Sequence, residues 1–266
     1  MLQRIISGVV ALAIVIPVLV FGGVDGAKWL VAAAMLIMLN EFGSVASPER
    51  PRGASVVMAA VGMTIYGMIS WGRDPMLVVG AMVIGAGALL TWSMFAHEDP
   101  EEGALAGSVT AVSVTYISAA LAFIGLVRGF EPHGFTWLIF ILVSTWVTDT
   151  GAYFAGRFFG KRKLLERISP KKTWAGVWGG VGLTVAVATG WALLDPFIPP
   201  HHAAILGALL AVSCVVGDLV ESMFKRARGI KDSGNIMPGH GGLLDRVDSL
   251  LFTVPVGWAY ATLFGL

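Results

Sequence analysis

The sequence predicts an all-α, polytopic integral membrane protein with about nine transmembrane helices. Hydrophobic residues make up 56% of the 266 positions and charged residues only 13%, and the mean hydropathy of +0.79 lies outside the range of soluble globular domains. Apolar runs recur along the chain at the length of about 20 residues that a helix needs to cross a bilayer. Lipid offers the backbone no hydrogen-bond partner and the runs do not alternate as barrel strands do, so we expect each run to be a helix.

The spans are bounded where polar or turn-forming residues interrupt the apolar runs. We expect the first run to remain as a helix rather than act as a signal peptide, because it is long, lacks a clear small-residue cleavage site and precedes further spans. The single cysteine, Cys214, falls inside a run and has no partner for an intrachain disulfide. The predicted spans are 4–23, 27–47, 54–71, 76–96, 108–127, 135–156, 173–194, 203–224 and 243–265.

The basic residues predict the orientation of these spans. With this arrangement, all of the 18 Lys and Arg residues except Lys28, Arg73 and Arg128 fall on one side of the membrane. Positive charge in loops favours the cytoplasmic side, so we expect the N-terminus and the two strongly basic loops to be cytoplasmic and the C-terminus to be outside.

Polar residues also divide the chain near residue 130, where the segment GFEPHG interrupts the apolar pattern. Residues 1–130 are poor in charge and are expected to form a transmembrane scaffold half. Residues 131–266 carry most of the polar residues and are expected to form a catalytic transmembrane half, with its charged site at the cytoplasmic interface.

Charged residues gather in segment 217–248, against the trend of the chain. Asp218, Glu221, Ser222 and Lys225 are spaced i, i+3, i+4 and i+7, which places them on one face of the eighth span. An acid within a span costs about 2.5–3.5 kcal/mol on insertion scales, so it normally faces a partner or a wet cavity. Internal pairing, for example of Glu221 with Lys225, is the structural alternative to a functional site.

Carboxylates from several spans predict a Mg²⁺ site. Asp245 and Asp248, at i and i+3, are expected to share one face at the start of the ninth span, across a loop from Asp218. Mg²⁺ binds one or two carboxylates and completes its shell with water and substrate phosphate. Asp149, in the sixth span, is a further intramembrane acid near the same interface. The expected ligands are therefore Asp218, Asp245, Asp248 and Asp149, and the number of ions is left open.

Glycines and bases between the acidic residues predict an anion site. Backbone amides beside glycines such as Gly241 and Gly242 can close on a phosphate, although a glycine-rich turn can also be purely structural. His240, between Gly239 and Gly241, suits a phosphate or acid–base role in these polar surroundings, although a lone histidine is more often structural. The accompanying bases are Lys225, Arg226, Lys231 and Arg246.

A second basic segment precedes the seventh span. Ser169-Pro170 is expected to start a turn, and Lys171 and Lys172 to lie in the first helical turn, where donors face anions. The basic segment could instead only set membrane orientation. Glu41, in the second span, is expected to cap an interhelical contact in preference to lining a substrate groove.

These residues carry a family resemblance. The pattern S-x-x-K-R-x4-K-D-x-G-x3-P-x-H-G-G-x2-D-R-x-D, from Ser222 to Asp248, resembles the signature of the phosphatidate cytidylyltransferases, or CDP-diglyceride synthases. The stretches DTGAYFAG and SPKKTW, within residues 148–180, also resemble that family. Met237 and Ala175 depart from it, since the family usually has Leu, Ile or Phe at the first position and often Glu or Gln at the second.

The resemblance implies an enzyme that converts CTP and phosphatidate to CDP-diacylglycerol and pyrophosphate. It also implies Mg²⁺ dependence, an all-helical membrane fold and a homodimer. Since the lipid phosphate lies at the headgroup level and CTP is cytosolic, we expect the active site at the cytoplasmic face of the inner membrane, where both charged segments fall; no nucleic-acid partner is expected. The expected catalytic residues are Asp218, Asp245, Lys225, Lys231 and His240. The expected substrate-binding residues are Lys171, Lys172, Ser222, Arg226, Arg246, Gly241 and Gly242.

Other functions could use the same residues. A CTP-dependent lipid kinase, or a cytidylyltransferase for another lipid phosphate, would need the same acids and bases. An anion or lipid transporter could also contain intramembrane acids and many glycines. A transporter would be expected to place its charges at the midplane of two matching halves, whereas here they cluster at one interface.

Overall fold

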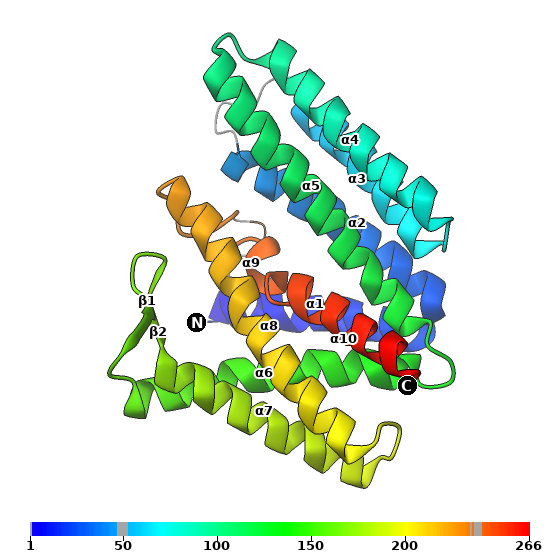
Figure 1. Cartoon of the computed structure of the whole chain (residues 1–266), viewed down its shortest axis with the longest axis vertical. Coiled ribbons are helices and arrows are strands. Elements are labelled where there is room, and N and C mark those ends of the chain that lie inside the picture. The colour runs from blue at the N-terminus through cyan, green and yellow to red at the C-terminus, as the bar shows by residue number, and fades with distance from the viewer. Residues whose placement is uncertain (1, 47–52, 235, 237–240) are drawn as a thin grey trace. The chain divides into compact units, whose positions relative to one another are not determined.

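The computed structural model describes residues 2–46, 53–234, 236 and 241–266, and this part of the chain forms two compact units (Figure 1). Unit 1 comprises Met1–Leu126 and Arg228–Arg246, and unit 2 comprises Val127–Ala227 and Val247–Leu266. The scaffold and catalytic roles expected for residues 1–130 and 131–266 stay predictions.

Unit 1 is built from helices that pack in sequence order, α1 on α2, α2 on α3 and α3 on α4. Its core contains fully buried apolar side chains such as Met35, Leu39 and Ile65. Tyr66 lies among them, and its hydroxyl donates a 2.6 Å hydrogen bond to the Lys28 carbonyl. The helices are α1 (Leu2–Phe21), α2 (Gly23–Ala46), α3 (Ala54–Ser70), α4 (Pro75–Ala96), α5 (Pro100–Arg128) and the short α9 (Leu244–Val247). The last two residues of α5 and the last residue of α9 are assigned to unit 2.

Unit 2 consists of four long helices and a small hairpin. Its elements are α6 (Gly134–Phe159), β1 (Lys163–Leu165), β2 (Ser169–Thr173), α7 (Trp174–Leu194), α8 (Pro200–Ala227) and α10 (Leu250–Phe264). Helix α7 lies along both α6 and α8, and α10 packs on α8 (Figure 1).

Small residues bring α6 and α7 into close contact. A Cβ atom at Gly180 would lie 2.9 Å from the Thr148 carbonyl oxygen, and one at Gly176 would lie 2.9 Å from that of Ala152. Glycine at these positions therefore allows the two backbones to approach, as small residues do in membrane helix pairs. Gly176 and Gly180, four residues apart on α7, therefore serve a contact between two helices of the same chain.

The helices confirm an all-α integral membrane protein. Within the described residues, seven helices are long and apolar enough to cross a membrane, and two shorter apolar helices are Gly8–Phe21 and Ala54–Ser70. All nine predicted apolar runs are thus helical, while nine complete crossings stay a prediction. The seven are Gly23–Val45, Pro75–Ala96, Pro100–Arg128, Gly134–Phe159, Trp174–Leu194, Pro200–Ala227 and the stretch Leu244–Phe264, which comprises α9, a two-residue turn and α10.

The hairpin corrects the prediction for the second basic segment. Lys171 and Lys172 lie on strand β2, not in the first turn of a helix, and β2 pairs antiparallel with β1 through Leu165 and Ser169. Helix α7 begins one residue after Thr173, whose backbone is extended and whose side chain accepts a hydrogen bond from the Gly176 amide. This N-cap fixes the helix start, so the two lysines remain in the strand.

The start of the ninth predicted span is also interrupted. Helix α9 ends at Val247, and Asp248 and Ser249 form a turn before α10. Asp245 and Asp248 therefore do not share a face of one continuous helix. Gly217 of α8 accommodates this turn, because a Cβ atom there would lie 3.0 Å from the Asp248 carbonyl oxygen.

Candidate functional site

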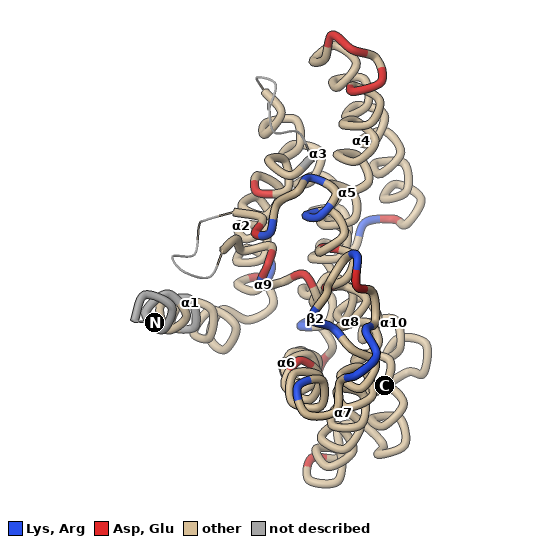
Figure 2. The backbone as a smooth tube through the Cα atoms, turned by 90° about the vertical axis from the view of Figure 1, so that its left-hand side faces the viewer, with Lys and Arg blue, Asp and Glu red and all other residues tan. Residues whose placement is uncertain are grey.

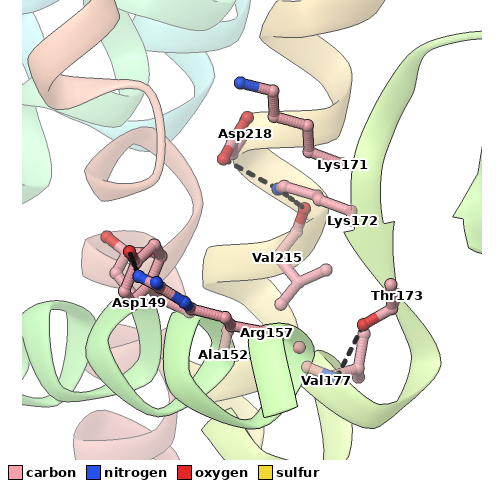
Figure 3. A pocket seen from close by; sticks show the side chains of 12 residues that line it. Asp149, Ala152, Arg157, Lys171, Lys172, Thr173, Val177, Val215 and Asp218 are labelled. Atoms are coloured by element: carbon pink, nitrogen blue, oxygen red, sulfur yellow. Dashed lines mark hydrogen bonds and ion pairs between the residues drawn. The ribbon is translucent and has the colours of Figure 1, made fainter. Parts of the chain in front are cut away.

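A pocket of about 500 Å³ opens in unit 2 among α6, β2, α7 and α8 (Figure 3). Its lining combines cationic and anionic side chains with small residues, which leave space for a ligand. The lining residues are Asp149, Ala152, Tyr153, Gly156, Arg157, Lys171, Lys172, Thr173, Gly176, Val177, Val215 and Asp218. Of these, the sequence predicted Asp149, Lys171, Lys172 and Asp218, so the structure brings four predicted site residues to one cavity.

Lys172 and Asp218 form the central ion pair of this pocket. The Lys172 Nζ lies 2.7 Å from Asp218 Oδ2, and both side chains are partly exposed to the cavity. Lys172 Nζ also lies 3.5 Å from the Val215 carbonyl oxygen, while the other carboxylate oxygen of Asp218 accepts a 3.2 Å hydrogen bond from Ser222. The pair links strand β2 to helix α8 and offsets the cost of a carboxylate within a span.

Two further cations face the same pocket. Arg157 donates from Nη1 to the Tyr153 hydroxyl at 2.9 Å, which orients its guanidinium at the end of α6 (Figure 3). Lys171 is exposed and makes no ion pair within the described part of the chain. Arg157 was not predicted as a site residue, because in the sequence it is one of many bases near a loop. Its position four residues after Tyr153 was the available signal.

Two further acids of unit 2, Asp149 and Asp248, lie within electrostatic range of Asp218. The charge of Asp218 acts on both Asp149 and Asp248, as does that of Lys172. Asp149 also accepts a 3.5 Å hydrogen bond from the Cys214 thiol. Among the described residues no group of three or more His, Cys, Asp or Glu side chains is close enough to enclose a metal ion by itself. Mg²⁺, however, needs only one or two protein carboxylates when phosphates complete its shell.

The prediction that Asp218, Glu221, Ser222 and Lys225 share one face of a helix is confirmed. Two of these residues form an ion pair with each other. Glu221 and Lys225 form a buried ion pair one helical turn apart, which is the structural alternative that the spacing allowed. Arg226 donates to the Ile168 carbonyl oxygen at 3.4 Å and connects α8 to the hairpin. In Figure 2, the blue segments that mark Lys and Arg lie beside strand β2.

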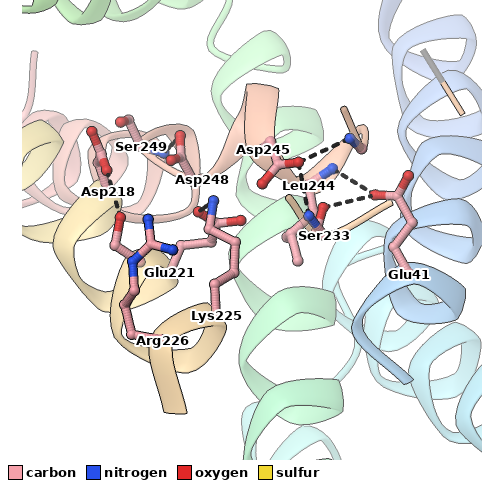
Figure 4. Close-up of polar contacts among 12 residues, drawn as sticks. Glu41, Asp218, Glu221, Lys225, Arg226, Ser233, Leu244, Asp245, Asp248 and Ser249 are labelled. Atoms are coloured by element: carbon pink, nitrogen blue, oxygen red, sulfur yellow. Dashed lines mark hydrogen bonds and ion pairs between the residues drawn. The ribbon is translucent and has the colours of Figure 1, made fainter. Parts of the chain in front are cut away.

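The glycine-rich segment, residues 229–242, belongs to unit 1, and within its described residues Asp245 binds two backbone amides. Asp245 Oδ2 accepts hydrogen bonds from the Ser233 and Gly242 amides, each at 2.9 Å (Figure 4). Gly241 has a φ of +87°, and a Cβ atom there would lie 2.8 Å from the same oxygen. A glycine is required at this position because other residues rarely adopt such a φ. These glycines thus have a structural role whether or not they contact substrate.

Glu41 holds the same segment from α2. Its Oε1 accepts from the Leu243 amide and its Oε2 from the Leu244 amide, each at 2.9 Å, and Ser233 Oγ lies 3.5 Å from Oε2 (Figure 4). Only the Leu244 donor belongs to a helix, the start of α9, so the predicted interhelical contact is found in part, and most of the contact is between α2 and loop residues. No local sequence pattern connects Glu41 to residues some two hundred positions away.

The remaining predicted site residues that the structure describes do not line the unit 2 pocket. Lys231 and Arg246 are exposed residues of unit 1, and His240 lies outside the described residues. Asp218 and Asp248 belong to unit 2 and Asp245 to unit 1, so a single ion shared by Asp218 and Asp245 stays a prediction.

An integral membrane protein with a charged pocket against its helix ends is the class that fold and site define. The chain belongs to the cytidylyltransferase family, whose sequence model matches residues 2–264. It is 33% identical over 263 residues to the phosphatidate cytidylyltransferase of Brucella suis biovar 1, covering 98% of this chain and 93% of that protein.

Other relatives carry the same name. Identity is 33% over 258 residues to the Mycobacterium leprae phosphatidate cytidylyltransferase, covering 88% of this chain and 80% of that protein. Identity is 42% over 159 residues to the Bacillus subtilis phosphatidate cytidylyltransferase, where the match spans 57% of this chain and 59% of that protein's length.

Proposed function

We propose that this protein transfers the cytidylyl group of CTP to phosphatidate, giving CDP-diacylglycerol and pyrophosphate. Membership of the cytidylyltransferase family and the shared name of the relatives support this reaction. The single observation that carries it is the unit 2 pocket, in which three cations and two carboxylates surround a cavity beside apolar helices. A cavity of this kind suits one anionic nucleotide and one anionic lipid headgroup.

In the proposed reaction, a phosphate oxygen of phosphatidate attacks the α-phosphorus of CTP. The new P–O bond forms as the bond from the α-phosphorus to the bridging oxygen breaks, and pyrophosphate leaves with that electron pair. Arg157, Lys171 and Lys172 would bind the reacting phosphates and offset their charge, which is the main barrier when two anions meet. Asp218 would hold Lys172 in place until phosphate oxygens compete for it.

We further propose that Mg²⁺ serves as the cofactor. The donors fit: Asp218 lies within electrostatic range of both Asp248 and Asp149, and carboxylate oxygens are the ligands that hard cations prefer. When bound, the ion would neutralise phosphate charge and favour departure of pyrophosphate. Asp245 is proposed as a further ligand on the sequence pattern alone.

We also propose nine crossings, a cytoplasmic N-terminus, an external C-terminus and an active site at the cytoplasmic face of the inner membrane. The one-sided distribution of Lys and Arg supports this orientation. The enzyme is proposed to act as a homodimer, as the family resemblance implies. Labelling of single cysteines in intact cells, introduced into a Cys214→Ala background, would test the sidedness.

The proposed reaction is tested with purified protein, CTP, phosphatidate and Mg²⁺. Formation of CDP-diacylglycerol that requires all three components supports the proposal. CDP together with a phosphorylated lipid alcohol would instead indicate a CTP-dependent kinase. Transport of lipid or anion without CTP consumption would contradict both enzyme functions.

A further inference from the structure

We propose that Glu41 is a positioning residue that orients Asp245 through the backbone of the glycine-rich segment. As far as it concerns catalysis, this inference rests on the proposed function. Glu41 is 6% exposed, and both of its carboxylate oxygens accept hydrogen bonds from main-chain amides. A carboxylate in such a place fixes the backbone, because charge-assisted bonds away from water are stronger than ordinary hydrogen bonds.

The contacts of Glu41 and Asp245 are interleaved along the chain. Asp245 binds the Gly242 amide, and Glu41 binds the next two amides, those of Leu243 and Leu244. Ser233 joins both carboxylates, because its amide donates to Asp245 and its hydroxyl donates to Glu41. A shift of Glu41 would therefore move the donors that hold Asp245, and with them the carboxylate itself.

Close approach to Glu41 explains two of the glycines. A Cβ atom at Gly234 would lie 2.8 Å from Glu41 Oε1, and one at Gly242 would lie 2.7 Å from Oε2. A side chain at Gly234 would require Glu41 to move, and one at Gly242 would collide with Ser233 Oγ as well as with Glu41. The glycines at 234 and 242 thus admit a buried carboxylate from α2, which is a function separate from phosphate binding.

The decisive variant is Glu41→Gln, which keeps the size of the side chain but replaces one acceptor oxygen with an NH₂ donor. Either Leu243 or Leu244 then loses its acceptor, and an unpaired buried amide is costly. Glu41→Asp keeps both oxygens on a side chain one methylene shorter. Glu101→Gln is the matched control, because it makes the same chemical change at an exposed position of unit 1.

The first measurement is amide hydrogen exchange by mass spectrometry, which needs no substrate. In Glu41→Gln, peptides containing Leu243 and Leu244 should exchange faster, and so should the peptide containing Ser233, whose amide is bound by Asp245 rather than by Glu41. Glu101→Gln should match the parent. Faster exchange confined to Leu243 and Leu244 would show a local contact only and would overturn the positioning role.

The second measurement is catalysis at several Mg²⁺ concentrations. Glu41→Gln should lower the turnover number roughly tenfold and raise the Mg²⁺ concentration for half-maximal rate, and Glu41→Asp should recover part of both. Parent-like kinetics in Glu41→Gln would overturn the inference. Absence of CDP-lipid formation by the parent would refute the proposed function instead, and the exchange result would still decide the anchoring.

A double variant keeps the inference testable if Glu41→Gln does not fold. Gly234→Ala alone should accelerate exchange at Ser233 and Leu244, because its methyl group collides with Glu41. Combining it with Glu41→Asp removes a methylene where the methyl is added, so the two effects should be less than additive. Strict additivity would contradict direct packing of Gly234 on Glu41.

Discussion

The Nζ atom of Lys172 on strand β2 lies 2.7 Å from Oδ2 of Asp218 on helix α8, and both side chains line the unit 2 pocket. The pair places a cation for phosphate beside a carboxylate for a metal ion, and Ser222 holds the second Asp218 oxygen. Since phosphates and Mg²⁺ bring opposite charges into the cavity together, they can replace the ion pair by two new ones without leaving a charge uncompensated.

Asp218→Asn should abolish nucleotidyl transfer while the protein stays folded. The substitution keeps the shape of the side chain, so Ser222 retains an acceptor, but it removes the charge that pairs with Lys172 and is proposed to bind the metal. We expect at least about a hundredfold loss of turnover, as for removal of a main electrostatic contributor. Asp195→Asn, at an exposed position after α7, is the control, and parent-rate turnover by Asp218→Asn would rule out the metal assignment.

Lys172→Gln should weaken substrate binding and also leave Asp218 without its ion-pair partner. We expect a higher KM for CTP together with a lower turnover number, whereas Lys161→Gln, at an exposed position outside the pocket, should behave as the parent. A double-mutant cycle with Asp218→Asn should give a coupling energy of about 0.5–3 kcal/mol in thermal unfolding, the range for residues in contact. Independent effects would mean that the pair does not act as a unit.

Gly241→Ala should destabilise the protein for two reasons that a control can separate. The backbone φ of +87° is strained for alanine, and its Cβ atom would lie 2.8 Å from Asp245 Oδ2. Gly229→Ala, with a φ of +67° and nothing within 4 Å of the added Cβ atom, has the strain alone, about 1–3 kcal/mol. In unfolding assays Gly241→Ala should therefore be the less stable variant, and equal stabilities would contradict the contact with Asp245.

Thr173→Ala should loosen the start of α7 next to the pocket. The Thr173 hydroxyl accepts a 3.1 Å hydrogen bond from the Gly176 amide, and loss of such a cap costs about 0.5–2 kcal/mol. The melting temperature should fall, and Thr173→Ser should restore most of it because serine caps equally well. A Thr173→Ser variant as unstable as Thr173→Ala would indicate that the methyl group, packed near Gly160, matters more than the cap.

Removal of divalent cations should stop the reaction reversibly. A chelator should abolish CDP-lipid formation, and added Mg²⁺ should restore it. Asp248→Asn should raise the Mg²⁺ concentration needed for half-maximal rate, because Asp248 lies within range of the Asp218 charge. Full activity in excess chelator would exclude the proposed cofactor.

Apolar run length and helical periodicity were enough to predict most of the fold. Each run became a helix because lipid allows no other local solution, and the spacing of Asp218, Ser222 and Lys225 placed them on one face. Periodicity says nothing about breaks inside an apolar run, so the turn at Asp248 and Ser249 was missed. The hairpin was missed because its basic segment has no alternating pattern, although Thr173 before Trp174 was a readable N-cap signal.

The candidate site was predictable in its residue types but only partly in its contacts. Asp149, Lys171, Lys172 and Asp218 were chosen for their charge within an apolar chain, and the structure places them around one pocket. The roles of Glu41 and the glycines depend on contacts between distant segments. Such contacts leave no local signal in a single sequence.

The transfer of label from CTP tests the central claim most directly. The purified protein would be incubated with phosphatidate, Mg²⁺ and CTP labelled at either the α- or the γ-phosphate. We predict that the α-label appears in the lipid product and the γ-label in pyrophosphate, because the bond between the α- and β-phosphates is the one that breaks. Appearance of the γ-label in lipid, or no consumption of CTP, would contradict cytidylyl transfer.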